Sequence, residues 1–136
     1  MSGFFLPIIY QMAKFDNIPL SEQKCIEIFI DHLWMENGLS ENTLSAYRND
    51  LANFSFWLHE NQQSLLSVEK ETIQHFLAYN YHQQQKRRSV ARLLSTLRRF
   101  YHFSCRENQI SEDPTRLLES PKGEHSLPIS LNEQQV

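Results

Sequence analysis

Glycine and cysteine are scarce in this sequence, and the two shortages narrow the choice of fold. Only three glycines occur among 136 residues and runs of β-branched residues are short, which favours an all-helical protein. The two cysteines, Cys25 and Cys105, form no CxxC pair. The sequence therefore predicts neither a zinc site nor a disulfide framework, and we expect both thiols to be reduced.

A long hydrophobic run is also lacking. The apolar segment at residues 4–10 is broken by Pro7 and is too short to cross a bilayer, so we expect no membrane partner. No basic region precedes it and no small-residue cleavage site follows it, which argues against a signal peptide. Two interpretations stay open. Translation starts at Met12 and residues 1–11 extend the reading frame, or the segment is a short apolar arm that docks on a partner or on the core.

Motifs for catalysis and for metal or cofactor binding are missing as well. The sequence contains no HExxH, GxxxxGK[ST], GxSxG or GxGxxG pattern, and its six histidines lack metal-ligand spacing. Glu69 and Glu71 are close in sequence, but a helix start whose dipole they complement explains them. We therefore expect no catalytic residue, metal, cofactor or small-molecule ligand in this chain.

Acidic residues are absent between Glu71 and Glu107, and this gap holds seven of the 13 lysines and arginines. The gap is therefore strongly basic within a chain whose net charge is −3. On a helix, Arg88, Arg92 and Arg99 fall within about 40° of one line, opposite an apolar face. No glutamate lies four residues from these arginines, so ion pairing within the helix does not explain them. The pattern predicts a surface that binds a polyanion.

Periodicity predicts a single all-α domain. Helices are expected at residues 21–37, 40–60, 69–81 and 88–107. Ser21 and Ser40 are the expected N-caps, Gly38 is expected to end the first helix, and Trp34 is expected in its buried stripe. An Asp-Pro pair predicts a short fifth helix over residues 113–119.

The second predicted helix has the clearest pattern. Its apolar residues recur at spacings of three and four, and they are Leu44, Tyr47, Leu51, Phe54 and Leu58. Its opposite face is short and polar, with Asn42, Ser45, Asn49 and Asn53, and Arg48 lies at the flank. Short side chains on that face allow a bulky partner to approach the backbone closely.

Four stretches of the sequence resemble one family. Residues 40–51, SENTLSAYRNDL, strongly resemble the second helix of tyrosine recombinases. More narrowly they resemble the Xer branch, XerD and XerC, which resolves chromosome dimers, with XerD the closer of the two. The likeness continues through residues 91–100, 112–114 and 120–128, in order and with matching spacing, and covers about residues 22–136.

The resemblance implies an N-terminal core-binding domain, a four-helix arrangement called SAM-like, which forms a C-shaped clamp around DNA with a second domain. Accordingly, we expect an N-terminal extension (1–20), a core-binding DNA-binding domain (21–119) and a linker (120–136) into an absent catalytic domain. The family's second and fourth helices enter adjacent major grooves. The positions that carry over are Thr43, Ser45, Ala46, Asn49, Arg88, Ser89 and Arg92. Arg48, Arg87 and Arg99 are added on charge and angle, and Asn42 from the short polar face.

The resemblance thus predicts double-stranded DNA binding as the N-terminal half of the clamp of a site-specific recombinase, in a bacterial, cytoplasmic and nucleoid-associated protein. A homologous recombinase protomer is the second expected partner. The family's nucleophilic tyrosine lies in the catalytic domain, so we expect this chain alone neither to cleave nor to rejoin DNA. Two alternatives stay open: a helical protein-interaction module whose arginine face binds an acidic partner and, less favoured, a transcription regulator.

Overall fold

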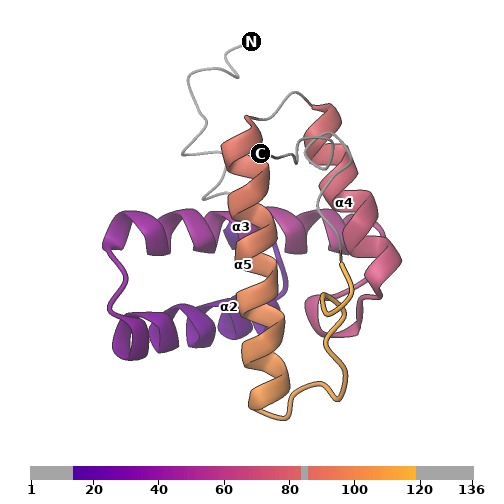
Figure 1. The fold of residues 1–136 in the computed structure, drawn as a ribbon. Helices are drawn as coiled ribbons and strands as arrows, with labels where there is room; N and C mark the ends of the chain where they lie inside the picture. The colour runs from indigo at the N-terminus through magenta and orange to yellow at the C-terminus, as the bar shows by residue number, and fades with distance from the viewer. Residues whose placement is uncertain (1–13, 84–85, 119–136) are drawn as a thin grey trace, which may run out of the picture.

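The computed structural model describes residues 14–83 and 86–118, which form helices joined by short turns (Figure 1). The α-helices are α2 (Leu20–His32), α3 (Glu41–Glu60), α4 (Lys70–His82) and α5 (Arg87–Arg106). A π-helical turn, η2 (Leu33–Asn37), continues α2, and a 3₁₀ turn, η3 (Leu65–Ser67), precedes α4. The described residues contain no strand, which confirms the all-α class, and none of their helices is long and apolar enough to cross a membrane. The predicted linker, 120–136, lies outside the described residues.

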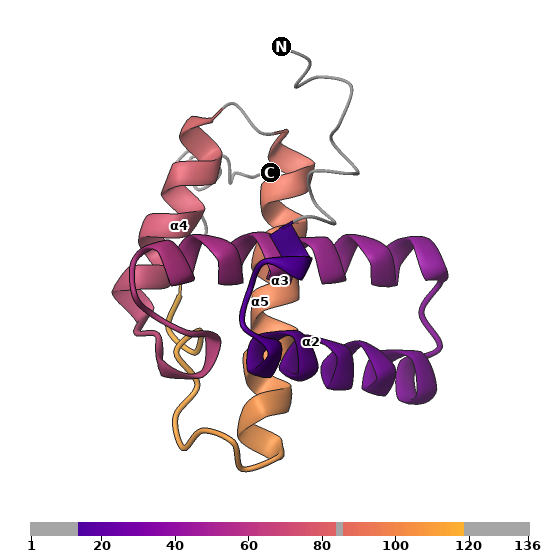
Figure 2. The same ribbon diagram turned by 180° about the vertical axis from the view of Figure 1, so that it is seen from behind.

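Helix α5 is packed against all the other long helices. Helices α2 and α3 lie side by side and antiparallel, α5 crosses them, and α4 runs alongside α5 (Figure 1 and Figure 2). The rings of Phe29 on α2 and Phe100 on α5 meet edge to face, with their centroids 5.4 Å apart. Helices α3 and α4 meet through Phe54 and Phe76, whose ring centroids are 4.7 Å apart. Aromatic side chains therefore fill the crossings between the helices.

The buried faces of α3 and α5 are those that periodicity predicts. The predicted apolar residues of α3, which are Leu44, Tyr47, Leu51, Phe54 and Leu58, are all buried. The apolar side of α5 is buried over its length, from Val90 to Ser104, and the Ser104 hydroxyl donates a hydrogen bond to the carbonyl of Phe100. Helices α3 and α5 therefore each bury one face in a common core, and the other face is accessible to solvent or a partner.

Gly38 and Ser40 shape the turn between α2 and α3 as predicted. Gly38 has a φ of 61°, a left-handed conformation that glycine adopts without a steric clash of a Cβ atom. The Ser40 hydroxyl accepts a hydrogen bond from the backbone N–H of Thr43 at 3.2 Å and so caps the N-terminus of α3. The turn between α2 and α3 is therefore determined by residues within the turn itself.

The prediction that Ser21 caps the first helix is wrong. Helix α2 begins at Leu20, and Pro19 occupies the cap position. The Pro19 carbonyl accepts hydrogen bonds from the N–H groups of Glu22 and Gln23, so the first turn has already formed before Ser21 could cap it. Proline can occupy this position because it lacks only the N–H donor and its carbonyl still accepts these bonds.

Trp34 is not part of the buried stripe, because its side chain is 56% exposed. The π-helical turn η2 begins one residue earlier, at Leu33. A π turn holds more residues than an α turn, so it rotates the residues that follow away from the core. A prediction that extends the α-helical period beyond Leu33 therefore places Trp34 on the wrong side of the helix.

The predicted short fifth helix is present as turns in the described residues. The Asp113 carboxylate accepts hydrogen bonds from the N–H and the hydroxyl of Thr115, at 2.8 and 2.6 Å, as expected of a residue that starts a helix. Residues 114–117 then form turns rather than a regular helix. Arg98 of α5 donates to the carbonyl of Leu118 at 2.8 Å, which holds this segment against α5. The predicted end of this helix, residue 119, lies outside the described residues.

The core includes two side chains from the segment that the sequence assigns to an N-terminal extension. Phe15 is 8% exposed and Ile18 is 3% exposed. The guanidinium carbon of Arg48 lies 4.1 Å from the centroid of the Phe15 ring, at cation–π distance. The hydrophobic core therefore begins before α2.

A buried carboxylate, that of Glu22, ties α2 to the centre of the fold. It accepts hydrogen bonds from the Ser55 hydroxyl of α3 at 2.8 Å and from the backbone N–H of Leu65 in η3 at 3.2 Å. The Leu65 carbonyl accepts a 2.6 Å hydrogen bond from the Tyr101 hydroxyl of α5. Burial raises the pKa of the nearby Cys25 thiol to about 11, and the negative charge of Glu22 adds to the rise. One network thus joins α2, α3, η3 and α5.

We expect Glu22→Ala to lower the free energy of unfolding by about 2–3 kcal/mol, because it leaves the buried Leu65 N–H and Ser55 hydroxyl without their acceptor. Urea denaturation would show this as a lower midpoint with an unchanged m-value. The matched control is Glu107→Ala, at an exposed position, where we expect a change within about 0.5 kcal/mol. Equal midpoints for Glu22→Ala and the wild type would contradict a stabilising role for the network.

Candidate nucleic-acid interface

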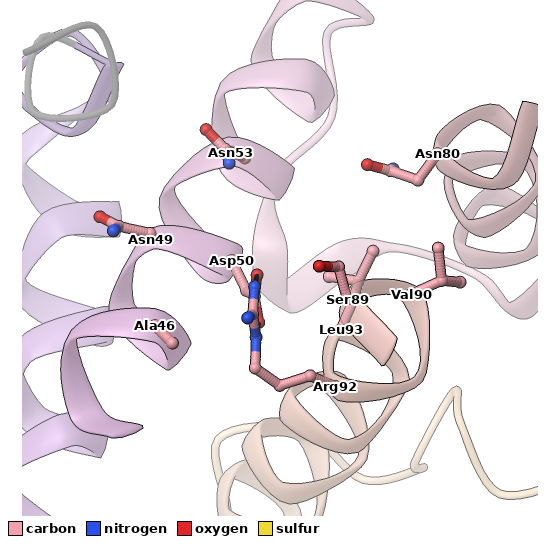
Figure 3. Close-up of a pocket in the computed structure, with 9 residues that line it drawn as sticks. All are labelled: Ala46, Asn49, Asp50, Asn53, Asn80, Ser89, Val90, Arg92 and Leu93. Atoms are coloured by element: carbon pink, nitrogen blue, oxygen red, sulfur yellow. Dashed lines mark hydrogen bonds and ion pairs between the residues drawn. The ribbon is translucent and has the colours of Figure 1, made fainter. Parts of the chain in front are cut away.

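A groove of about 360 Å³ lies where α3, α4 and the first turns of α5 meet (Figure 3). Its walls are Ala46, Asn49, Asp50 and Asn53 of α3, Asn80 of α4, and Ser89, Val90, Arg92 and Leu93 of α5. Most of these side chains are amides, hydroxyls or charged groups. The groove is therefore built for hydrogen bonding rather than for an apolar ligand.

The groove brings together four residues that the sequence predicts as DNA contacts. Ala46 and Asn49 come from α3, and Ser89 and Arg92 come from α5. They meet because the short polar face of α3 adjoins the basic face of α5 where the two helices cross. Two patterns far apart in the sequence thus form one continuous surface.

Arg92 is held by a buried carboxylate at the floor of this groove. Its Nε and Nη2 atoms donate to the two carboxylate oxygens of Asp50, at 2.9 and 2.8 Å. The Thr96 hydroxyl donates a third hydrogen bond to Asp50, at 2.9 Å. The Asp50 side chain is 9% exposed and the Arg92 side chain 40%, so the guanidinium reaches the groove while its partner stays inside.

The Asp50–Arg92 pair is charged. Burial raises the pKa of the Asp50 carboxyl above its usual value, whereas the hydrogen bond and the positive charge of Arg92 and the bond from Thr96 oppose this rise. The bond to Asp50 raises the pKa of the Arg92 guanidinium. We assign an ionised pair, because two short parallel bonds from one guanidinium are typical of a carboxylate. Its carboxylate is occupied and is not available as a general base.

Several other predicted contacts lie exposed around the groove. Exposed side chains are those of Asn42, Ser45, Arg87, Arg88 and Arg99. Thr43 is partly buried, and its hydroxyl accepts a hydrogen bond from Ser40 at 3.1 Å. The guanidinium of Arg99 lies 6.0 Å from the centroid of the Tyr47 ring.

Arg48 faces away from the groove, towards α2. Its Nη2 atom lies 2.7 Å from a carboxylate oxygen of Glu27, and its guanidinium covers the ring of Phe15. These contacts fix α3 to α2 and to the N-terminal segment. Because both the charge and the ring face of the guanidinium are used within the fold, the structure gives Arg48 a packing role.

The N-terminus of α5 concentrates positive charge. Lys86, Arg87 and Arg88 are all exposed there, no acidic residue occurs in the first turn, and no side chain in the described part of the chain caps the helix. A helix N-terminus already carries a partial positive charge, so three cations at this end destabilise the isolated helix. The arrangement is suited to a phosphate, which would satisfy both the N–H groups and the cations.

The sequence prediction missed Asp50 and Asn80 as parts of this site. Asp50 lies on the apolar side of α3, between Tyr47 and Leu51, where a carboxylate requires a buried partner. A carboxylate at that position indicates that an arginine of the acid-free stretch pairs with Asp50. Nothing in the pattern around Asn80 distinguishes it from a solvent-facing amide, and only the packing of α4 brings it to the groove.

Asn53 has an unusual environment among the amides that line the groove. Its Oδ1 atom is buried and accepts no hydrogen bond from any described residue. Asn80 lies across the groove from Asn53 (Figure 3), and its amide nitrogen donates to the Phe76 carbonyl at 2.8 Å. The described residues include no group of three His, Cys, Asp or Glu side chains that could hold a metal.

We expect Asp50→Ala to lower the free energy of unfolding by about 2 kcal/mol. Removing one partner of a buried ion pair typically costs about 3–5 kcal/mol. The partial exposure of Arg92 lets water replace part of the lost interaction and reduces this figure. Urea denaturation of Asp50→Ala beside the exposed control Asp31→Ala measures the effect. A loss below about 0.5 kcal/mol would contradict it.

Comparison with known proteins identifies the family. Residues 26–108 match the phage integrase N-terminal SAM-like domain. The chain is similar to the tyrosine recombinase XerD of Shewanella oneidensis, with 49% identity over 111 residues, which cover 82% of this chain and 37% of that protein. It is 46% identical to the tyrosine recombinase XerD of Proteus mirabilis over 121 residues, which cover 89% of this chain and 39% of that protein.

A third relative, the tyrosine recombinase XerD of Pseudomonas aeruginosa, is 43% identical over 115 residues, which cover 85% of this chain and 39% of that protein. The chain thus spans about two fifths of the length of these relatives. The matches confirm the predicted resemblance to Xer-type tyrosine recombinases and agree with the helical arrangement described above. The chain belongs to the family of phage integrase N-terminal SAM-like domains.

Proposed function

We propose that this chain binds double-stranded DNA as the N-terminal half of the clamp of a site-specific tyrosine recombinase. The observation that carries the proposal is the junction of two surfaces. The polar groove between α3 and α5 opens beside the N-terminus of α5, where Lys86, Arg87 and Arg88 are exposed. Hydrogen-bonding groups for base edges and cations for phosphates thus occur next to each other, as DNA recognition requires.

The cations at the N-terminus of α5 are assigned to the phosphates. Arg87 and Arg88 make no hydrogen bond or ion pair with another described residue, and Ser89 follows them with a hydroxyl. Guanidinium groups and free helix N–H groups both bind phosphate oxygens. These residues therefore supply the electrostatic part of the affinity and fix the position of the domain on the duplex.

The short polar face of α3, on which Asn42 and Ser45 are exposed and Ala46 and Asn49 are partly buried, is assigned to close contact with the duplex. Asn42, Ser45, Ala46 and Asn49 are short, so the α3 backbone can approach a groove of DNA without steric hindrance. Thr43 and Arg99 lie at the edges of this surface and contribute secondary contacts. Arg48 contributes to the packing of α3 on α2 rather than to the DNA surface.

A second copy of a homologous recombinase is the proposed protein partner. Ile28, Trp34 and Met35 expose 54%, 56% and 77% of their surfaces along α2 and η2. Large apolar residues exposed on two consecutive elements favour a protein contact site. Binding of a homologous protomer there would leave the α3–α5 groove free for DNA.

Strand cleavage is assigned to the part of the relatives that this chain does not cover. Those relatives are named as tyrosine recombinases, and the chain corresponds to about two fifths of their length. The groove itself contains amides, a hydroxyl and a neutralised ion pair, none of which is an activated nucleophile. In this proposal the domain holds the DNA in a bacterial cytoplasm, at the nucleoid, while another domain performs the chemistry.

Binding to a labelled 30-base-pair duplex, followed by fluorescence anisotropy across a salt series, tests the proposal. We expect the logarithm of the affinity to fall linearly with the logarithm of the salt concentration. Arg87→Ala and Arg88→Ala should each make the slope shallower by about 0.9, because each removes one phosphate contact.

The matched control is Arg116→Ala, which removes an exposed arginine from the turn that follows α5. We expect its salt slope to equal that of the wild type. If the wild-type chain binds no duplex even at low salt, the proposal is wrong, and an acidic protein becomes the better partner for the arginine face. If Arg87→Ala, Arg88→Ala and Arg116→Ala all give the same slope, the assignment of the phosphate contacts is wrong.

A further inference from the structure

We propose that Arg92 is a specificity-determining residue that reads guanine in the major groove, and that Asp50 is the positioning residue that presents it. This inference rests on the proposed function and deepens it, because it separates Arg92 from the other arginines of α5. Arg87 and Arg88 supply charge at the end of the helix, whereas Arg92 supplies hydrogen-bond donors in a fixed direction.

The geometry of the ion pair leaves one edge of the guanidinium unused. The Asp50 carboxylate accepts hydrogen bonds from the Nε–H group and from one N–H of Nη2. A guanidinium has five N–H groups, so the two of Nη1 and the second of Nη2 remain. One N–H of each Nη atom forms the end-on edge of the guanidinium, which is the edge that binds the O6 and N7 atoms of guanine as a pair.

The direction of this edge is fixed by the fold. Asp50 lies on the buried side of α3 and is itself held by the Thr96 hydroxyl of α5 at 2.9 Å. Thr96 is fully buried, and its hydroxyl oxygen also lies 2.9 Å from the Arg92 carbonyl, so its single proton is shared between the two acceptors. The carboxylate is thus tied to both helices before any ligand binds. A donor pair that is already ordered loses less entropy when it binds, which favours directional recognition.

The charge of Arg92 argues against a phosphate contact. Asp50 lies within hydrogen-bond distance and cancels the positive charge as seen from the groove. A neutralised pair attracts a phosphate only weakly and releases few counterions, whereas hydrogen bonds to a base edge depend on the direction of the donors rather than on net charge. The neighbouring Asn53 and Asn80 are also uncharged, so the groove as a whole is suited to base edges (Figure 3).

Guanine is the base that fits this donor set. The free edge of Arg92 consists only of donors, and guanine presents two acceptors, O6 and N7, in the major groove. Adenine presents one acceptor and one donor there, and cytosine presents a donor. The amide side chains beside Arg92 can accept or donate and therefore do not change this preference.

Two duplexes of identical sequence test the inference without knowledge of the target site. One 30-base-pair duplex contains guanine, and in the other every guanine is replaced by 7-deazaguanine, which lacks the N7 acceptor and still pairs with cytosine. We expect the wild-type chain to bind the guanine duplex at least about twofold more tightly, since a bidentate contact discriminates by about 5–150-fold and about half of its free energy is lost. For Arg92→Ala we expect a ratio of about one.

Arg87→Ala is the matched control on the same helix. It should weaken binding to both duplexes equally and keep the wild-type ratio. A wild-type ratio of one, or a ratio in Arg92→Ala equal to that of the wild type, would overturn the inference while duplex binding and its salt dependence still support the proposed function. If the wild-type chain binds neither duplex, the result contradicts both the proposed function and this inference.

Asp50→Asn separates positioning from simple structural support. The substitution keeps the size of the side chain but removes its charge, so the guanidinium loses its fixed direction and regains its full positive charge. We expect the guanine ratio to fall towards one while the salt slope becomes steeper by about 0.9. A residue that only stabilises the fold would not steepen the slope.

Arg92→Lys covers the case in which Asp50→Asn does not fold. Lysine keeps the charge but cannot make the two parallel bonds of the guanidinium. We expect the same loss of guanine discrimination for Arg92→Lys as for Arg92→Ala. An Arg92→Lys variant with the wild-type ratio would overturn the inference.

Discussion

The half-buried ion pair between Asp50 and Arg92 is the interaction on which the rest of this surface depends. It joins α3 and α5 at their crossing, with Thr96 as its third member, and it lies at the floor of the polar groove. A buried pair of this kind adds little net stability compared with apolar packing, but it is costly to break on one side. It therefore favours one relative placement of the two helices, and with it one shape of the groove.

The residues that the structure describes include two buried carboxylates that have different roles. Glu22 accepts hydrogen bonds from neutral groups, a hydroxyl and a backbone N–H, and links four elements inside the core. Asp50 accepts from a cation at the surface and keeps that cation ordered. The first carboxylate holds the scaffold together, and the second connects the scaffold to the surface that meets the ligand. Both are exceptions to the apolar stripes, and both are hydrogen-bonded as buried polar groups require.

Local patterns predicted the helices well because each helix needs one apolar face. Leu44, Tyr47, Leu51, Phe54 and Leu58 are buried as their spacing indicates, and Ser40 and Gly38 act at the ends they mark. The failures have two origins. Some are local, because Pro19 takes the cap position expected of Ser21 and the π turn at Leu33 changes the helical period. Others are tertiary, because Asn80 reaches the groove only through the packing of α4. The charge pattern located the basic surface but could not separate a neutralised arginine from a free one.

The burial of Phe15 and Ile18 has a consequence for the extent of the smallest independently stable unit. A fragment that starts at the first long helix, Leu20, would lose both side chains from the core and would leave Arg48 without the ring it covers. Each buried large apolar side chain contributes about 1.5–3 kcal/mol, and a whole domain is stable by only about 5–15 kcal/mol. A truncation guided by helix boundaries alone would therefore remove a large share of the stability margin, and residue 14 is the sounder starting point for a shortened version of the domain.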